Sequence, residues 1–378
     1  MSFHRVAGVP LIQRTALSAL RSGFDAVVAL APDDSRPVRA LFAGDSRTAV
    51  IPVVGGALDA ALTTERVAFI PSDCLVDKAM LEQVYAAECN GGPIALRAGS
   101  GGAAIILAPR ASLAALNGFD LAQAAAVTAQ TAPFAGGLCI PVPDAGAAAS
   151  AERTLVRQLA AATAATDGPI ARFDRAISTR LSRHIVRTPL RPNHITMIGT
   201  GIGCLAAWSL AQGTYLSGVI GTLLFWFAVI IDGCDGEVAR LKFQESFFGY
   251  VFDVTTDNLV HVAIFIGLGV GLYRAAPDGQ LFWLVALLVG GFACATAATM
   301  LTLVRQPPAQ DQRPRSPRGK LRQRLLRGFE ALMNRDFAYV LLGLALIGHL
   351  DWFLWGAAFG TYAYAAALVV VYRWRDAE

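Results

Sequence analysis

Long segments without charge constrain this chain more than any other feature. Residues 194–231, 281–304 and 352–372 contain no Asp, Glu, Lys or Arg. Each is long enough to cross the hydrocarbon core of a bilayer, which takes about 20 apolar residues in a helix. Charged residues make up only 16% of the chain, against about a quarter in an ordinary soluble protein. The second half is therefore predicted to be embedded in a membrane.

Six membrane helices are predicted in this half, at about 194–212, 214–233, 247–272, 280–304, 334–350 and 352–373. One face of the membrane then receives the arginines before residue 194, the pair Arg240 and Lys242, eight basic residues within 305–327, and those after 372. The other face receives only Arg274. Because basic loops stay in the cytoplasm, the chain is predicted to be a multi-pass protein of the cell (inner) membrane with both termini cytoplasmic.

Residues 1–150 have a different composition, in which short β-capable runs alternate with helical stretches and turn residues. This alternation predicts an α/β domain with a mostly parallel sheet. The segment opens without the basic-then-apolar pattern of a secretory signal, so a cytosolic domain is expected. The six cysteines include no CxxC pair, and we expect neither a disulfide framework nor a zinc site.

Residues 151–190 are predicted to form a linker followed by an interfacial amphipathic helix. Phe173, Ile177, Leu181 and Ile185 recur at four-residue spacing with arginines around them, a pattern typical of helices that lie on a membrane surface. An ordinary surface helix is the alternative. The formal charge of +4 is modest, and its basic residues lie beside apolar segments, which favours anionic lipids over nucleic acid as partners.

Two pairs of aspartates occur in the stretch from Ile231 to Val262. Asp232 and Asp235 are three residues apart, and Asp253 and Asp257 are four apart, so each pair shares one face of a helix. Carboxylates at the membrane boundary need a cavity, a cation or each other. Hard oxygen ligands favour Mg²⁺ or Mn²⁺, and two such ions per site suit phosphoryl transfer. The alternative is that these aspartates end helices and lie in water.

Three neighbours of the aspartates fit the same chemistry. Gly236 and Gly249 leave room where a phosphate or a second helix could approach. Arg240 offers a fixed cation with the bidentate geometry that phosphate accepts.

The whole pattern resembles the signature of the CDP-alcohol phosphotransferases. The eight matching positions are Asp232, Asp235, Gly236, Ala239, Arg240, Gly249, Asp253 and Asp257. The resemblance extends over residues 170–375 and includes the PNHIT segment at 192–196, which is similar to the opening of the family's first membrane helix. It implies an all-α six-helix transmembrane bundle, often a homodimer.

The resemblance also implies roles for the matching residues. Asp232, Asp235 and Asp253 would bind the metal ions, and Asp257 would contact them and take the proton of the acceptor hydroxyl. The CDP pocket would be formed by Gly236, Ala239, Arg240 and Gly249. The implied reaction transfers a phosphoalcohol from a CDP-alcohol to a hydroxyl acceptor and releases CMP. The first expectation for the acceptor is an inositol phosphate, and the alternative is a phospholipid synthesis that uses CDP-diacylglycerol as the donor.

A second resemblance concerns the first domain. The segments Val6–Leu30 and Phe69–Asp77 are similar to sugar-nucleotide transferases, and the domain order is that of bifunctional inositol-phosphate cytidylyltransferase and di-myo-inositol-phosphate-phosphate synthases. The glycine-rich phosphate loop and lysine expected before Val6 are absent. The nucleotidyltransferase-like domain is therefore predicted to be catalytically inactive, unless the true start lies upstream. Asp73 fits either a metal ligand or a turn residue.

The remaining candidates are weaker. His261 could extend the site, although a histidine packed inside the helices is the better interpretation. The candidate acceptor contacts are Arg191, Lys242, Arg305 and Arg335, at the mouth of the predicted bundle. Two other functions stay open, a cation-binding membrane transporter and a noncatalytic membrane anchor for the first domain. The pattern does not identify the CDP-alcohol or the acceptor.

Overall fold

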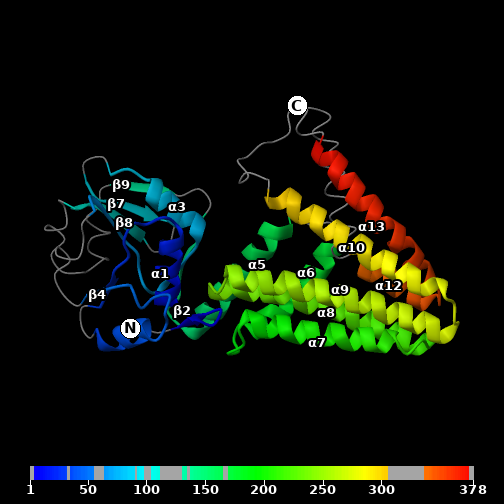
Figure 1. Ribbon diagram of the computed structural model, residues 1–378. Coiled ribbons are helices and arrows are strands. Elements are labelled where there is room, and N and C mark those ends of the chain that lie inside the picture. The colour runs from blue at the N-terminus through cyan, green and yellow to red at the C-terminus, as the bar shows by residue number, and fades with distance from the viewer. Residues whose placement is uncertain are drawn as a thin grey trace. The chain divides into compact units, whose positions relative to one another are not determined.

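The chain divides into two compact units, Met1–Gln158 and Leu159–Glu378. Figure 1 shows the computed structural model, in which the first unit is blue to teal and the second is green to red. It describes residues 4–31, 35–54, 64–89, 92–97, 104–110, 130–133, 137–164, 169–304 and 336–373.

The first unit combines short strands with helices. The helices are α1 (Leu11–Arg21), α2 (Arg36–Ala43) and α3 (Lys78–Ala86), and α5 (Ala145–Ala164) crosses into the second unit. A four-stranded sheet has the order β5 (Arg66–Phe69), β8 (Ala104–Pro109), β7 (Ile94–Arg97) and β9 (Gln130–Pro133). Two-stranded pairs are β1 (Arg5–Val6) with β2 (Val9–Pro10), β3 (Ala29–Leu30) with β4 (Val53–Val54), and β6 (Cys74–Val76) with β10 (Cys139–Pro141).

The alternation of strands and helices is as predicted, but the expectation of a mostly parallel sheet is wrong for the described strands. β8 runs antiparallel to both β5 and β7, and in the four-stranded sheet only the β7–β9 pair is parallel. The reason lies in the connection between β7 and β8, which has only six residues. A parallel pair needs a crossover of about a dozen residues or more, so these strands can pair only as an antiparallel ladder.

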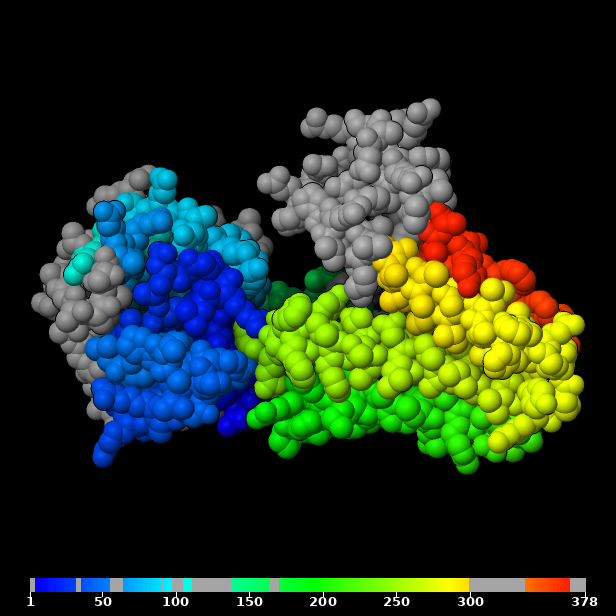
Figure 2. All heavy atoms as spheres, viewed as in Figure 1, coloured from blue at the N-terminus to red at the C-terminus, as the bar shows by residue number. Residues whose placement is uncertain are grey.

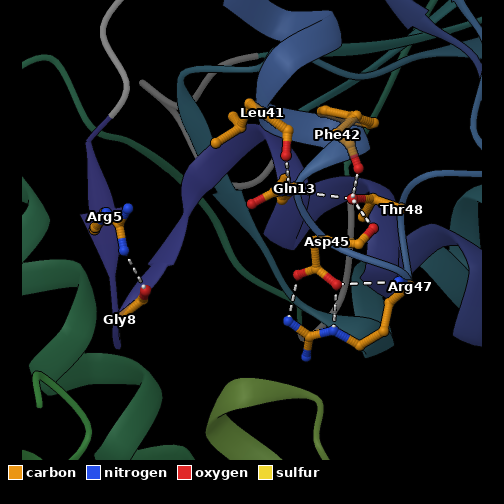
Figure 3. A network of polar contacts seen from close by, with 8 residues as sticks. All are labelled: Arg5, Gly8, Gln13, Leu41, Phe42, Asp45, Arg47 and Thr48. Carbon is orange, nitrogen blue, oxygen red and sulfur yellow. Dashed lines mark hydrogen bonds and ion pairs between the residues drawn. The ribbon is translucent and has the colours of Figure 1, made fainter. Parts of the chain in front are cut away.

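Buried polar groups fix the end of α2 on α1, as Figure 3 shows. Gln13 donates to the carbonyl oxygen of Leu41 at 2.9 Å and to the Thr48 hydroxyl at 3.1 Å. Thr48 is fully buried and donates in turn to the Phe42 carbonyl oxygen at 3.1 Å. These bonds satisfy carbonyls at the end of the helix, which would otherwise be costly to bury.

The second unit is helical. Its helices are α6 (Pro169–Ile185), α7 (Pro192–Leu210), α8 (Tyr215–Lys242), α9 (Phe247–Ala275), α10 (Gln280–Val304), α12 (Asp336–Leu346) and α13 (Leu350–Arg373). By length and apolar composition, α8, α9 and the Gln280–Ala298 part of α10 could each cross a membrane. The mostly helical second half is confirmed. That all six predicted segments cross a membrane stays a prediction.

α8 continues beyond the predicted limit at residue 233, to Lys242. Thr214 caps its start by accepting from the Ser217 amide, and the helix ends at Phe243, which takes a left-handed conformation with φ of 58°. The first half of the aspartate signature therefore lies entirely within helical turns.

Glycines bring α7 and α9 into backbone contact. A Cβ atom added at Gly267 would lie 2.3 Å from the carbonyl oxygen of Ala207, and one at Gly271 would lie 2.1 Å from that of Leu210. Such small-residue contacts are common where membrane helices associate. The position of α9 is therefore fixed by direct contact with the backbone of α7.

The core of this unit is apolar and is built by α7, α8, α9, α10, α12 and α13. Its fully buried members include Phe225, Ile264, Leu268, Leu288 and Leu354. The outer face that Figure 2 shows is formed by α7, α9 and α10, coloured green to yellow. Large apolar side chains are exposed on these helices, among them Trp208, Phe248, Leu259, Ile266, Phe282 and Trp283.

Candidate active site

Three of the four predicted aspartates meet in space. Asp232 and Asp235 lie on α8 and Asp253 lies on α9, and one carboxylate oxygen from each lies within 4.8 Å of the other two. α7 packs against both α8 and α9, the two helices that carry these aspartates. The three carboxylates therefore converge beside α7. Like charges at this separation repel unless a cation or protons neutralise them.

α7 also orients one of these carboxylates directly. The Thr196 hydroxyl donates to Oδ2 of Asp235, and both residues are buried. On the same first turn of α7, the side-chain oxygen of Asn193 lies 3.5 Å from the position of a Cβ atom at Gly249. The PNHIT segment therefore touches the helices that carry both aspartate pairs.

Gly249 belongs to the capped start of α9. Ser246 caps this helix, and its hydroxyl oxygen accepts a hydrogen bond from the Gly249 amide at 3.0 Å. A Cβ atom at Gly249 would lie 3.0 Å from that oxygen. A side chain at this position would press on the cap that begins α9 one turn before Asp253.

The donor set fits a hard divalent cation. Oδ1 of Asp253 is buried and has no hydrogen-bond partner within the part of the chain that the structure describes. An unpaired buried carboxylate oxygen is costly, and a bound cation would satisfy it. Carboxylate oxygens are the ligands that Mg²⁺ and Mn²⁺ prefer, so the chemistry of the three residues agrees with a metal site.

The other signature residues extend the same face of α8. Asp232, Asp235, Gly236, Ala239 and Arg240 follow the three- and four-residue spacing that places side chains on one side of a helix. A Cβ atom at Gly236 would lie 3.8 Å from Nη2 of Arg240, so the exposed guanidinium reaches back over the glycine toward the carboxylates.

The fourth aspartate lies outside the group of three. Asp257 is half-buried on α9, one turn after Asp253. The Nδ1 atom of His261 lies 2.7 Å from the backbone oxygen of Asp257. The imidazole ring packs against the rings of Phe225, Phe292 and Phe337, which confirms that His261 is packed inside the helices.

The candidate acceptor contacts divide into two groups. Lys242 is buried, and its Nζ donates to the carbonyl oxygens of Thr188 at 2.7 Å and Leu190 at 2.8 Å. It thereby holds the loop that leads to Arg191, which is exposed at the start of α7. Arg305 and Arg335 lie outside the described residues. Asp73 is exposed beside Cys74 in the first unit, and its backbone oxygen accepts from the Val142 amide at 2.7 Å.

Two buried polar residues at this site are missing from the sequence prediction. Thr196 lies in the PNHIT segment, but a hydroxyl in that segment has no spacing that pairs it with Asp235, 39 residues later. Glu237 lies between signature positions and is 2% exposed. A glutamate at a membrane boundary usually faces water, so only packing of the helices reveals it as a buried group.

Comparison with known proteins agrees with the geometry. Residues 190–362 match the CDP-alcohol phosphatidyltransferase family. The chain is 38% identical over 131 residues to a bifunctional IPC transferase and DIPP synthase of Rubrobacter xylanophilus, covering 34% of this chain and 29% of that protein. It is 34% identical over 92 residues to a phosphatidylinositol phosphate synthase of Mycobacterium bovis, covering 24% of this chain and 42% of that protein.

A solved structure of phosphatidylinositol phosphate synthase from Mycobacterium tuberculosis, with CDP-DAG bound, aligns with 53% of this chain and 92% of its own length, at 22% identity and a TM-score of 0.34. The chain spans less than half the length of the two curated relatives named above. The family match includes the first turn of α7 and all four aspartates of α8 and α9. Residues 190–362 of this chain are thus a domain of the CDP-alcohol phosphatidyltransferase family.

Proposed function

We propose that this chain is a metal-dependent membrane transferase that moves a phosphoalcohol group from a CDP-alcohol to a hydroxyl acceptor and releases CMP. The observation that carries the proposal is the convergence of Asp232, Asp235 and Asp253 from two helices within 4.8 Å. The buried, unpartnered oxygen of Asp253 supports a cation at this point. The family match over residues 190–362 supports the reaction class.

The reaction needs one bond to form and one to break at phosphorus. The acceptor oxygen attacks the phosphorus that carries the alcohol, and the bond from this phosphorus to the oxygen of CMP breaks. Asp257 takes the proton of the acceptor hydroxyl, a role that its place one turn from Asp253 allows. Arg240 pairs with the diphosphate from the exposed end of the same face of α8.

Asp232, Asp235 and Asp253, together with Asp257, would hold Mg²⁺ or Mn²⁺, with two ions per site. Bound there, the metal supplies charge neutralisation at the diphosphate and at the departing oxygen. The Thr196 hydroxyl donates to Oδ2 of Asp235 and would hold this carboxylate in place for binding a cation. Gly236 leaves the CDP side of this face of α8 without a side chain.

An inositol phosphate is the proposed acceptor. The curated relatives include IPC transferase and DIPP synthases and phosphatidylinositol phosphate synthases, and these names share the inositol phosphate group. The exposed Arg191, fixed by the loop that Lys242 holds, provides a cation at the same end of α7 as Thr196. Arg305 and Arg335 are proposed as further contacts to the acceptor phosphate.

The wider organisation is proposed on the same grounds. Residues 1–150 form a nucleotidyltransferase-like domain without cytidylyltransferase activity. Residues 151–190 form a linker and an interfacial helix. Residues 191–378 form a six-helix bundle that crosses the inner membrane. The exposed apolar side chains of α7, α9 and α10 support contact with lipid. Both termini and the site face the cytoplasm, and two copies form a homodimer.

The test is CMP release by the purified full chain with Mg²⁺ or Mn²⁺. CDP-inositol and CDP-diacylglycerol are offered as donors, each with inositol phosphate or inositol as acceptor. Release from one pair that Asp257→Asn abolishes is the expected result. A cation transporter or a noncatalytic anchor would release no CMP from any pair, and Asp257→Asn would then equal the wild type.

A further inference from the structure

A second carboxylate lies behind the metal-binding turn of α8 and belongs to none of the signature positions. Glu237 follows Asp235 by two residues, and its side chain is 3% exposed. Its Oε1 atom accepts from the Ser178 hydroxyl at 2.8 Å and from the Thr179 hydroxyl at 3.4 Å. The Arg175 guanidinium lies 3.6 Å from the same oxygen. Three groups of one turn of α6 thus converge on one atom of α8.

The same face of α6 makes further polar contacts. Ser182 donates to the backbone oxygen of Cys234 at 3.5 Å, and the Cys234 thiol donates to the backbone oxygen of Ser178 at 3.5 Å. On the preceding turn, Tyr339 of α12 donates to Oδ1 of Asp174. Asp174, Ser178 and Ser182 are each about 2% exposed or less, so α6 presents a buried polar row at four-residue spacing.

The interfacial amphipathic helix that the sequence predicts accounts for the apolar row of α6 but not for this buried polar row. The apolar row of α6 is only partly covered, since Phe173 is 57% exposed, whereas Leu181 and Ile185 pack against Ile195 and Ile231. The fully buried row is the polar one. A helix that merely lies on a membrane surface has no reason to bury a carboxylate and two hydroxyls against its neighbour, because burying polar groups is costly unless they are paired.

We infer that Glu237 is a positioning residue for the metal site, and that α6 sets the geometry of the aspartates on α8 through it. The inference rests on the proposed metal binding by Asp232, Asp235 and Asp253. The turn 234–237 is held from one side by α6, through Glu237 and Cys234, and from the other by Thr196 of α7, through Asp235. With both contacts in place, the turn can neither rotate nor shift without breaking a buried hydrogen bond.

The inference is tested by Mn²⁺ binding to the purified full chain in detergent, measured as loss of the free Mn²⁺ signal in electron paramagnetic resonance. Ser178→Ala removes the shortest hydrogen bond to Glu237 and keeps the charge, and Glu237→Gln removes the ion pair. Ser209→Ala is the matched control, because Ser209 is also buried and donates to the backbone oxygen of Ser217 at 2.9 Å. Ser217 lies at the start of α8, far from the aspartates.

We expect Ser178→Ala and Glu237→Gln to raise the Kd for Mn²⁺ about tenfold, as loss of groups that orient metal ligands commonly does, while Ser209→Ala keeps the wild-type Kd. An unchanged Kd in Ser178→Ala would overturn the inference, whether or not Glu237→Gln weakens binding through its charge. If the wild-type chain itself binds no Mn²⁺, or if Asp235→Asn binds it as well as wild type, the proposed metal site fails instead.

Discussion

The contact between α7 and α9 makes a quantitative prediction about Gly267. A methyl group at this position would lie 2.3 Å from the Ala207 backbone oxygen and 3.0 Å from the Ala207 carbonyl carbon. A carbon and an oxygen atom approach to about 3.4 Å, so the two helices must separate by about 1 Å. The obstructing atoms are backbone and cannot rotate away. Overpacking of this kind costs about 1–3 kcal/mol, and we expect Gly267→Ala to lie near the upper end.

Gly201→Ala is the control for this variant. Gly201 lies inside α7, the helix that Gly267 of α9 packs against, and a Cβ atom at Gly201 meets nothing within 4 Å. Both substitutions carry the same gain in helix propensity, about 1 kcal/mol, so their difference isolates the clash. For a unit of this size, about 3 kcal/mol corresponds to a Tm difference of about 6–12 °C.

Tryptophan fluorescence during heating measures this difference, because all six tryptophans follow residue 200 and report on the second unit. Separation of α7 from α9 should also lower CMP release in Gly267→Ala, since Asp253 moves with α9. Equal Tm values for the two variants would refute the close approach of these helices.

Three further predictions concern single side chains. Thr196→Val keeps the shape of the residue but removes the hydrogen bond to Asp235; such bonds to charged groups contribute about 1.5–3 kcal/mol, so CMP release at limiting Mn²⁺ should fall at least tenfold, and an unchanged rate would contradict the assigned contact. Asp253→Asn removes one of three charged ligands, and both Mn²⁺ binding and CMP release should be lost; retention of Mn²⁺ binding would place the cation elsewhere. The Arg47 guanidinium lowers the pKa of Asp45 below its ordinary 3.8, so the pair stabilises the first unit above that pH and its contribution disappears as the pH falls through the lowered value. Asp45→Asn should therefore speed deuterium exchange in α2 at pH 7, by about 1 kcal/mol of local stability, and its difference from wild type should shrink as the pH falls below 3.8.

The sequence predicts the aspartate site because the two residues of each aspartate pair lie only three or four positions apart. Residues three and four apart share a helix face whatever the rest of the chain does, and this places Asp232 with Asp235 before any tertiary contact is known. The resemblance to the CDP-alcohol phosphotransferases adds that Asp253 joins them. In the structure these three carboxylates lie within 4.8 Å of one another.

Predictions that depended on connections and on helix ends were less accurate. The expectation of a mostly parallel sheet is wrong because the six residues between β7 and β8 are too few for the crossover that a parallel pair needs. The predicted end of α8 near residue 233 follows from the charge-free segment, which ends at residue 231. In the structure the carboxylates of Asp232 and Asp235 face one another and α9, so the helix continues until Phe243 adopts a left-handed conformation.

The orientation of α6 shows a different limit. Hydrophobic periodicity predicts an amphipathic helix here, but it does not predict which polar side chains are buried against a neighbouring helix. Next to a membrane domain, apolar side chains can stay exposed to lipid while polar side chains are buried. Polar groups then carry the contact between helices, since a hydrogen bond such as that from Ser178 to Glu237 has no competing water within the packed interface.

The buried polar row of α6 and the continuation of α8 beyond residue 233 have one physical origin, and together they explain how the site is built. A carboxylate near lipid must find a partner, so each acidic residue on α8 becomes a point at which another helix can be fixed. Asp235 is bound by Thr196 of α7, Glu237 by Ser178 of α6, and Asp232 approaches Asp253 of α9. Three helices, α6, α7 and α9, are thereby fixed against residues 232–237 of α8. All of these contacts are made to one helix, α8. A substitution at any of them should therefore lower the affinity for the cation before it unfolds the second unit.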